Sequence, residues 1–97
     1  MKILWTERAI ERISEIAKYI AYDSPLAAER WAEKIIQKVE ALSEFPKSGR
    51  KIPELNKKEY RELVFGNYRV IYKTSGETMY VLTVRHFKQI LPIEETK

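Results

Sequence analysis

Residues 61–72 read RELVFGNYRVIY, and their pattern predicts the structure of the C-terminal half of the chain. β-Branched and aromatic residues recur on both sides of Gly66-Asn67, a pair that is a strong signal for a hairpin turn. A second turn signal, Ser75-Gly76, separates this hairpin from another run of the same composition. Residues 61–65, 68–73 and 78–85 are therefore predicted to form a three-stranded antiparallel meander.

Before this meander, the apolar residues recur at helical spacing. Residues 2–5 are predicted to form a short strand, and Thr6 can cap a helix whose apolar stripe ends near Tyr22. Ser24-Pro25 supplies an N-cap and a first helical position for a second helix, which ends before Phe45-Pro46. Because the connection is short, the helices should form a hairpin. The expected α+β fold is an N-terminal strand and an antiparallel helix hairpin packed on a C-terminal three-stranded antiparallel meander.

The composition limits the class of protein. A chain of 97 residues is too short for two independent cores, so residues 1–97 are expected to form a single domain. With no cysteine and one histidine, neither a disulfide scaffold nor a metal or cofactor site is expected. No apolar run approaches the ~18 residues that a membrane span needs, so a cytoplasmic protein is expected. The net charge of +4 favours a polyanionic partner such as nucleic acid, a nucleic-acid enzyme or an acidic peptide.

Two-residue turns predict which side chains share each face of the meander, because side chains alternate along a strand. The first face is expected to hold Leu63, Val70, Tyr72, Met79, Val81 and Thr83. The second face is expected to hold Glu62, Val64, Arg69, Ile71, Tyr80, Leu82, Val84 and His86. Both faces of the last two strands are therefore apolar.

The helix hairpin can cover only one of these faces. Since monomers rarely leave a large apolar patch bare, the second face is interpreted as a binding surface. The residues expected to contact a partner there are Ile71, Leu82, Val84, Arg69 and Arg85. Coverage by the basic loop at residues 46–59, or by self-association, is the alternative that the pattern leaves open. The tail from Pro92 onward is charged and expected to be loose.

Arg69, His86 and Lys88 are the residues that could carry catalysis if the protein is a ribonuclease. RNA cleavage without a metal needs a cation to stabilise charge on the phosphate and groups that move protons. An arginine can do the first and a histidine the second. An arginine and a histidine on a sheet are more often structural or partner-binding than catalytic, so that interpretation stays open as well.

The order of elements and several motifs resemble the RelE/ParE toxin superfamily. The motifs are YI at residues 19–20, SPLAA at 24–28, FPKSG at 45–49, the stretch 61–72 and VLTVRH at 81–86. The resemblance covers essentially the whole chain. It implies the toxin of a type II toxin–antitoxin system, which a cognate antitoxin neutralises by wrapping around it in a hetero-oligomer.

Members of this superfamily act on two kinds of target. RelE-like members cut messenger RNA in the ribosomal A site, whereas ParE-like members inhibit DNA gyrase. Arg69 matches an arginine that contacts the scissile phosphate in the RNA-cleaving branch. However, Ile93 and acidic residues stand where a late tyrosine would serve cleavage, and Phe87 follows His86 where a tyrosine is found in another branch. The missing hydroxyl favours a ParE-like gyrase inhibitor that is not an enzyme, with a RelE-like mRNA endonuclease acting on the ribosome as the alternative.

Overall fold

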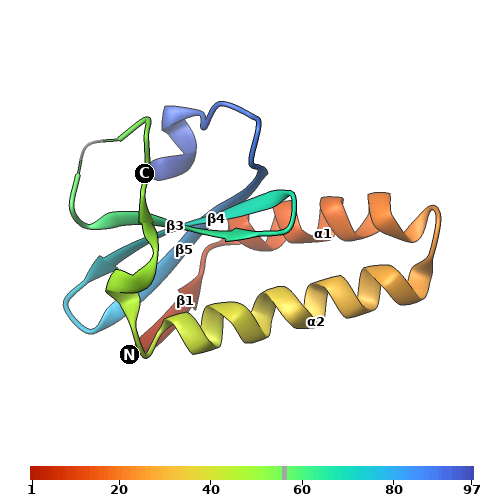
Figure 1. Cartoon of the computed structure of the whole chain (residues 1–97), viewed down its shortest axis with the longest axis horizontal. Coiled ribbons are helices and arrows are strands. Elements are labelled where there is room, and N and C mark those ends of the chain that lie inside the picture. The colour runs from red at the N-terminus through yellow and green to blue at the C-terminus, as the bar shows by residue number, and fades with distance from the viewer. Residues whose placement is uncertain (56) are drawn as a thin grey trace.

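The computed structural model describes residues 1–55 and 57–97. Two helices form a hairpin against one face of a five-stranded sheet and extend past the sheet at one end (Figure 1). The helices are α1 (Glu7–Ala21) and α2 (Pro25–Leu42), with two short 3₁₀ helices, η1 (Pro46–Ser48) and η2 (Ile93–Thr96). The strands are β1 (Lys2–Trp5), β2 (Arg50–Lys51), β3 (Tyr60–Phe65), β4 (Tyr68–Ser75) and β5 (Thr78–His86).

The strands lie in the order β1-β5-β4-β3-β2. β3, β4 and β5 form the predicted antiparallel meander, so the expected α+β fold is confirmed. β1 pairs with β5 in parallel and forms one edge of the sheet. β2, which comes from the basic loop, pairs with β3 and forms the other edge, a pairing that the sequence pattern did not predict.

Both long helices begin where the sequence predicts. The Thr6 hydroxyl accepts a hydrogen bond from the backbone N–H of Ala9 at 3.2 Å, and the Ser24 hydroxyl accepts one from Ala27 at 3.1 Å. Each cap satisfies a first-turn donor that has no partner within its helix. Within the described residues, neither helix has the length and hydropathy that crossing a bilayer requires.

The main core lies between the helix hairpin and the sheet. Its buried residues are Ala9, Ile35, Val39, Leu42, Val70, Tyr72, Met79, Val81 and Val84. Ile35 is fully buried, whereas Trp31, Ile13 and Leu63 are partly buried against this cluster. The apolar stripes of the two helices therefore pack on the face of the sheet where the sequence predicted Val70 and Tyr72.

A β-bulge in β5 changes the expected arrangement of side chains. Tyr72 pairs with Val81, but Ile71 pairs with Thr83, so Leu82 is an extra residue in β5. The predicted alternation holds up to Leu82 and is wrong beyond it, because one inserted residue moves every later side chain to the other face.

The bulge moves four residues of β5. Thr83, expected with the helices, instead lies on the face of Arg69. Arg85, expected to contact a partner with Arg69, is the direct cross-strand neighbour of Arg69. Val84 packs in the main core instead of on the second face. His86 pairs with Tyr68, which also packs on the helix side, so the predicted grouping of His86 with Arg69 is wrong.

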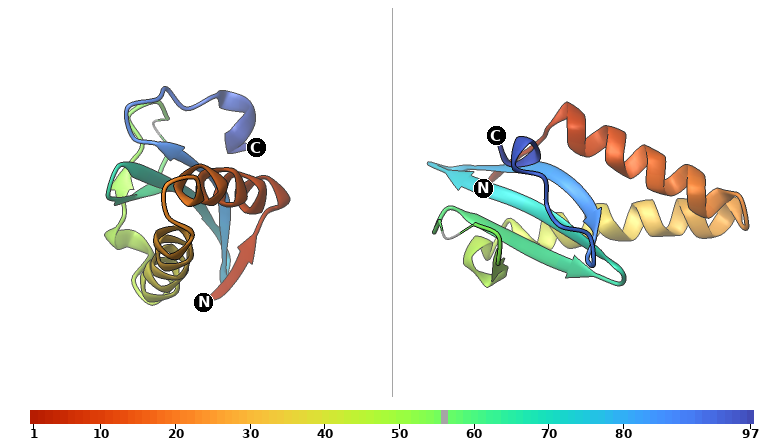
Figure 2. Two further views of the ribbon diagram at one scale, coloured as in Figure 1. Left: turned by 90° about the vertical axis from the view of Figure 1, so that its right-hand side faces the viewer. Right: turned by 90° about the horizontal axis from the view of Figure 1, so that it is seen from above.

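The chain itself covers the second face of the sheet. Ile52 from the basic loop and Leu91 from the C-terminal segment pack with Ile71 and Leu82 in a second cluster. Ile71 is 0% exposed and Leu82 is 6% exposed, so the expectation of an open docking face is wrong. The C-terminal segment, expected to be loose, instead ends in η2 and runs over the strands on the side away from the hairpin (Figure 2).

Gly49 lies against the buried ring of Tyr72, whose hydroxyl donates to the carbonyl of Pro46 at 2.5 Å. A Cβ at position 49 would overlap that hydroxyl, and the fully buried ring has no free space to move into. Gly49→Ala is expected to lower the free energy of unfolding by about 1–3 kcal/mol in urea denaturation. The exposed Lys47→Ala is the control, and equal stability of the two variants would contradict this packing.

Candidate functional site

Arg69 is held inside the chain by two carboxylates. Its Nη1 and Nη2 donate to the carboxylate of Glu54, at 3.0 and 2.5 Å. Nη1 also lies 3.4 Å from Glu62 Oε2, and Nη2 donates to the carbonyl of Gln89 at 2.7 Å. Arg69 is only 4% exposed, so the arginine that would bind phosphate if the protein were a ribonuclease is already paired and buried.

Arg85, the cross-strand neighbour of Arg69, is held by the C-terminal segment. Its Nε and Nη2 donate to the carboxylate of Glu95 at 2.9 and 2.6 Å. The same carboxylate accepts hydrogen bonds from Arg12 at 2.8 Å and from the Thr83 hydroxyl at 2.7 Å. Glu95 itself is 5% exposed. Its hydrogen bonds connect η2 with α1 and β5.

Three glutamates balance the charge of these arginines. Arg69 and Arg85 stand directly opposite each other, an arrangement of like charges that would destabilise the sheet by itself. The sequence pattern placed Glu62 on the face of Arg69, but it gave no signal for Glu54 and Glu95. Those two residues come from segments without a strand period, so only the folded chain brings them to the arginines.

The pKa values of two glutamates follow from these contacts. Hydrogen bonds from Arg69 lower the pKa of Glu54 to about 2, against the opposing effect of burial. Burial raises the pKa of Glu95, but hydrogen bonds from Arg12, Thr83 and Arg85 outweigh it and bring this pKa to about 2. Both carboxylates therefore remain charged at pH values well below those at which a glutamate side chain usually becomes protonated.

Acid is expected to destabilise the fold. Because Glu54 and Glu95 have lower pKa values folded than unfolded, their contribution is complete above pH 4.5 and is lost as the pH falls toward 2. A shift of this size in one buried carboxylate corresponds to on the order of 2–3 kcal/mol. Urea denaturation at pH 3 and pH 7 measures the difference. Glu95→Gln should reduce the pH dependence, whereas the exposed Glu94→Gln should not, and equal pH profiles would contradict this assignment.

His86 lies apart from Arg69. Its ring packs between the rings of Tyr68 and Phe87, with centroids 5.7 and 5.6 Å away. Lys88 follows in an exposed turn, where its backbone N–H donates to His86 Nδ1 at 3.3 Å. The fold therefore does not bring Arg69, His86 and Lys88 into one site, and their catalytic roles stay predictions.

The hairpin end of the molecule exposes large apolar side chains. Tyr19, Tyr22 and Leu26 are 77%, 95% and 54% exposed. They lie at the joint of α1 and α2, where the hairpin extends past the sheet (Figure 1). This apolar surface was not predicted, since the sequence pattern does not show how far the hairpin projects.

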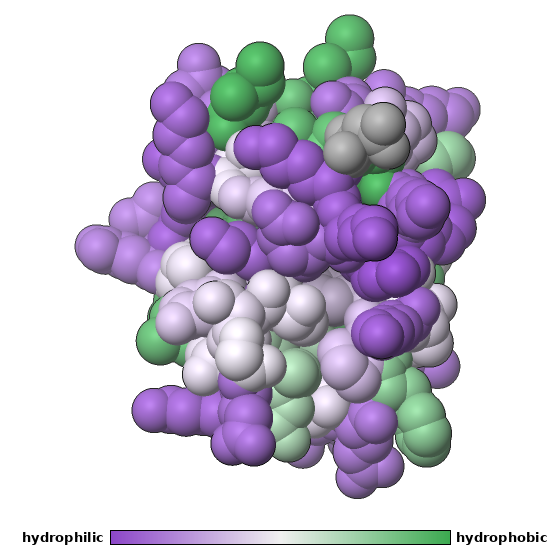
Figure 3. Space-filling view, turned by 90° about the vertical axis from the view of Figure 1, so that its left-hand side faces the viewer, coloured by the Kyte–Doolittle hydropathy of each residue, from purple (hydrophilic) through white to green (hydrophobic). Residues whose placement is uncertain are grey.

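The opposite end of the molecule is largely hydrophilic (Figure 3). A hollow there is lined by cationic side chains from η1, β2, β3 and the loop between them. These residues are Lys47, Lys51, Lys58 and Arg61. The positive net charge is therefore partly concentrated on one open surface, which can attract a polyanion.

The chain has relatives over most of its length. Residues 3–91 match the family described as ParE toxin of type II toxin-antitoxin system, parDE. The chain is 41% identical over 93 residues to a Sinorhizobium fredii protein named "Putative toxin Y4kP", covering 94% of this chain and 93% of that protein. It is 33% identical over 86 residues to Toxin RelE2 of Caulobacter vibrioides, covering 88% of this chain and 93% of that protein.

A solved structure shares the fold. It is a chain of the chromosomal ParDE TA system from P. aeruginosa, with a TM-score of 0.74 and 19% sequence identity. The match covers 89% of this chain and 95% of that chain. The arrangement of the two helices and the sheet is therefore common to both proteins.

Proposed function

Because the chain belongs to the ParE toxin family of type II toxin–antitoxin systems, we propose that it inhibits DNA gyrase and that a cognate antitoxin neutralises it. The position of Arg69 carries this proposal. A ParE-like inhibitor needs a surface that binds gyrase, whereas a RelE-like nuclease needs a free cation beside proton-transferring groups.

Arg69 is poorly placed to bind the phosphate of a messenger RNA. It would have to leave Glu54 and Glu62, and the side chain of Glu62 is only 1% exposed. Removing a partner from a buried ion pair leaves an uncompensated charge, which is strongly unfavourable. The side chain of His86 lies on the opposite face of the sheet from that of Arg69. The next residue is Phe87, which has no hydroxyl for proton transfer.

The cationic hollow supports a target that works on nucleic acid. Lys47, Lys51, Lys58 and Arg61 line it at the end of the molecule opposite the joint of α1 and α2 (Figures 1 and 3). Gyrase bound to its DNA is a polyanionic assembly, and a cluster of like charges speeds association with such a partner. We place the first contact with the gyrase–DNA complex at this hollow.

A supercoiling assay tests the proposed target. Purified toxin, freed from its antitoxin, is expected to block supercoiling of relaxed plasmid by gyrase, and added antitoxin should restore it. The double variant Lys47→Glu with Lys51→Glu should inhibit less. Reversal of the exposed Lys34 and Lys38 on α2 is the matched control. Absence of inhibition at excess toxin would overturn the proposed target.

The RelE-like alternative is tested in parallel by primer extension on messages translated in vitro. Under the gyrase proposal, no A-site cuts should appear. Cuts that disappear in His86→Ala and Lys88→Ala, from a toxin that leaves gyrase active, would favour the endonuclease instead.

A further inference from the structure

Residues 87–97, here called the C-terminal strap, are attached to the rest of the chain mainly by polar contacts. Leu91 is 3% exposed, but Phe87, Ile90 and Ile93 are 45%, 82% and 66% exposed. The strap is held instead by the hydrogen bonds of Glu95 and by the Leu91 N–H, which donates to Glu54 Oε2 at 3.0 Å. A segment held in this way can leave without opening the main core.

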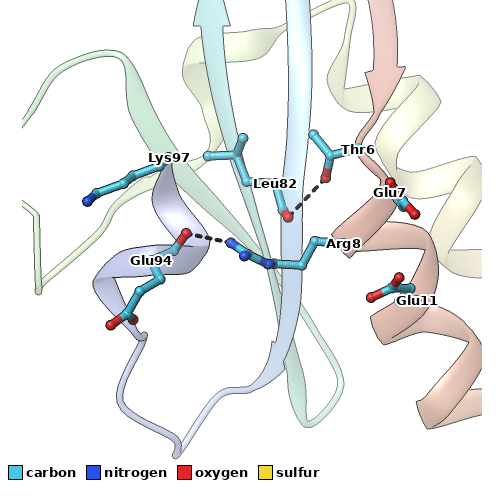
Figure 4. A pocket seen from close by; sticks show the side chains of 7 residues that line it. All are labelled: Thr6, Glu7, Arg8, Glu11, Leu82, Glu94 and Lys97. Carbon is cyan, nitrogen blue, oxygen red and sulfur yellow. Dashed lines mark hydrogen bonds between the residues drawn. The ribbon is translucent and has the colours of Figure 1, made fainter.

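An open groove separates the strap from the beginning of α1 (Figure 4). Arg8 reaches across this groove, and its Nη1 donates to the carbonyl of Glu94 at 2.5 Å. The groove is lined by Thr6, Glu7, Arg8, Glu11, Leu82, Glu94 and Lys97. The strap therefore bridges to α1 through side chains and leaves part of Leu82 facing the groove.

Two arginines that contact the strap have more donors than the described part of the chain supplies acceptors. The Nε atoms of Arg12 and Arg69 are buried and have no hydrogen-bond partner among the described residues. Unpaired buried donors are costly, and a guanidinium prefers a carboxylate as its acceptor. The surface around these arginines is therefore suited to a ligand that brings carboxylate oxygens.

We propose that the strap is an internal ligand, and that an acidic segment of the protein partner displaces it. Glu95 occupies a carboxylate-binding site made by Arg12, Thr83 and Arg85. Leu91 occupies the neighbouring apolar site. The strap itself thus defines the chemistry of the competitor, which is a peptide with a large apolar residue followed four positions later by a carboxylate.

Displacement of the strap would open much of the second face of the sheet. Ile71 and Leu82 would lose the cover of Leu91, and Arg69 would lose its bond to the Gln89 carbonyl. The partner would then contact Ile71, Leu82, Arg69 and Arg85, while Val84 would stay in the main core. This inference rests on the proposed function only in identifying the partner as the antitoxin.

Hydrogen exchange in the full-length chain tests whether Glu95 holds the strap. The amides of Gln89, Leu91 and Glu95 donate to His86, Glu54 and Pro92 and report on its attachment. Glu95→Gln is expected to speed their exchange by about tenfold or more, because it removes charge-assisted hydrogen bonds. Glu94→Gln removes the same charge from an exposed side chain and should leave exchange unchanged. Equal exchange in the two variants would overturn the proposal.

Binding of a labelled synthetic peptide tests the site itself. The probe is KQILPIEETK, the sequence of residues 88–97. It should bind the Glu95→Gln chain about tenfold or more tightly than the wild-type chain, whose own strap competes at high effective concentration. The same peptide with glutamine at the position of Glu95 should bind about tenfold more weakly. Equal affinity of the peptide for the two chains, or equal affinity of the two peptides for the Glu95→Gln chain, would overturn the proposal.

A variant on the sheet side separates opening of the strap from loss of the site. Arg85→Gln should also speed exchange in the strap, but it should not gain affinity for the peptide, because the guanidinium that binds the carboxylate is missing. Tight peptide binding to this variant would contradict the proposed site. Neither measurement involves gyrase, so failure of the proposed target and failure of this inference are distinguishable.

Discussion

Arg69→Ala is expected to lower the free energy of unfolding by about 3–5 kcal/mol, the cost of leaving a buried ion pair without one partner. Arg69 is 4% exposed, and the substitution would leave the carboxylates of Glu54 and Glu62 without the cation that they share. Urea denaturation at neutral pH measures the change. Since the whole domain is expected to have about 5–15 kcal/mol of stability, this variant would be close to unfolding.

The matched control for this prediction is Arg30→Ala. Arg30 is exposed on α2, and its removal should change the free energy of unfolding by less than about 0.5 kcal/mol. An Arg69→Ala chain as stable as wild type would show that the ion pairs are dispensable and would return Arg69 to the candidates for phosphate binding. Loss of toxicity in Arg69→Ala is therefore informative about catalysis only when the variant is shown to be folded.

Ile35→Ala is expected to cost about 2–5 kcal/mol of unfolding free energy. Ile35 is 0% exposed to solvent. It lies in the main core, where it packs with Val39 of the same helix and with the sheet. Truncation removes buried methyl and methylene groups and leaves a cavity that the surrounding strands only partly fill. A fall in the midpoint of urea denaturation at unchanged slope would give the value.

The neighbouring residue provides the control for this core substitution. Ile36 is 41% exposed on the same helix, so Ile36→Ala makes the same chemical change outside the core. Its effect should stay within about 0.5 kcal/mol. Similar losses in the two variants would mean that α2 is rotated relative to the orientation described above.

Most of the elements could be predicted because their signals are local. Thr6 and Ser24 can cap only the turns that follow them, and Gly66 adopts a positive φ of 58° in the turn between β3 and β4. The family was also recognisable, since its motifs lie in these same elements.

The candidate site was harder to predict than the fold. The face expected to bind a partner was identified as apolar and cationic. Its covering by the basic loop, here through Ile52, was the alternative that the pattern left open, but its covering by Leu91 was not foreseen. Glu54 and Glu95 lie 15 and 10 residues from the arginines that they bind. At such separations no short-range spacing rule relates an acid in a loop or tail to a base in a strand.

The helices, the meander, the turns and the family could be predicted from the amino-acid sequence, because caps, turn residues and apolar periods act between residues close along the chain. The packed chain alone shows which arginines are paired and that both faces of the sheet are covered. The bulge at Leu82 reverses the alternation of β5, and the loop and strap return over the second face. The bulge and the return of these segments both depend on packing between parts of the chain that are distant in sequence, so local sequence patterns do not predict them.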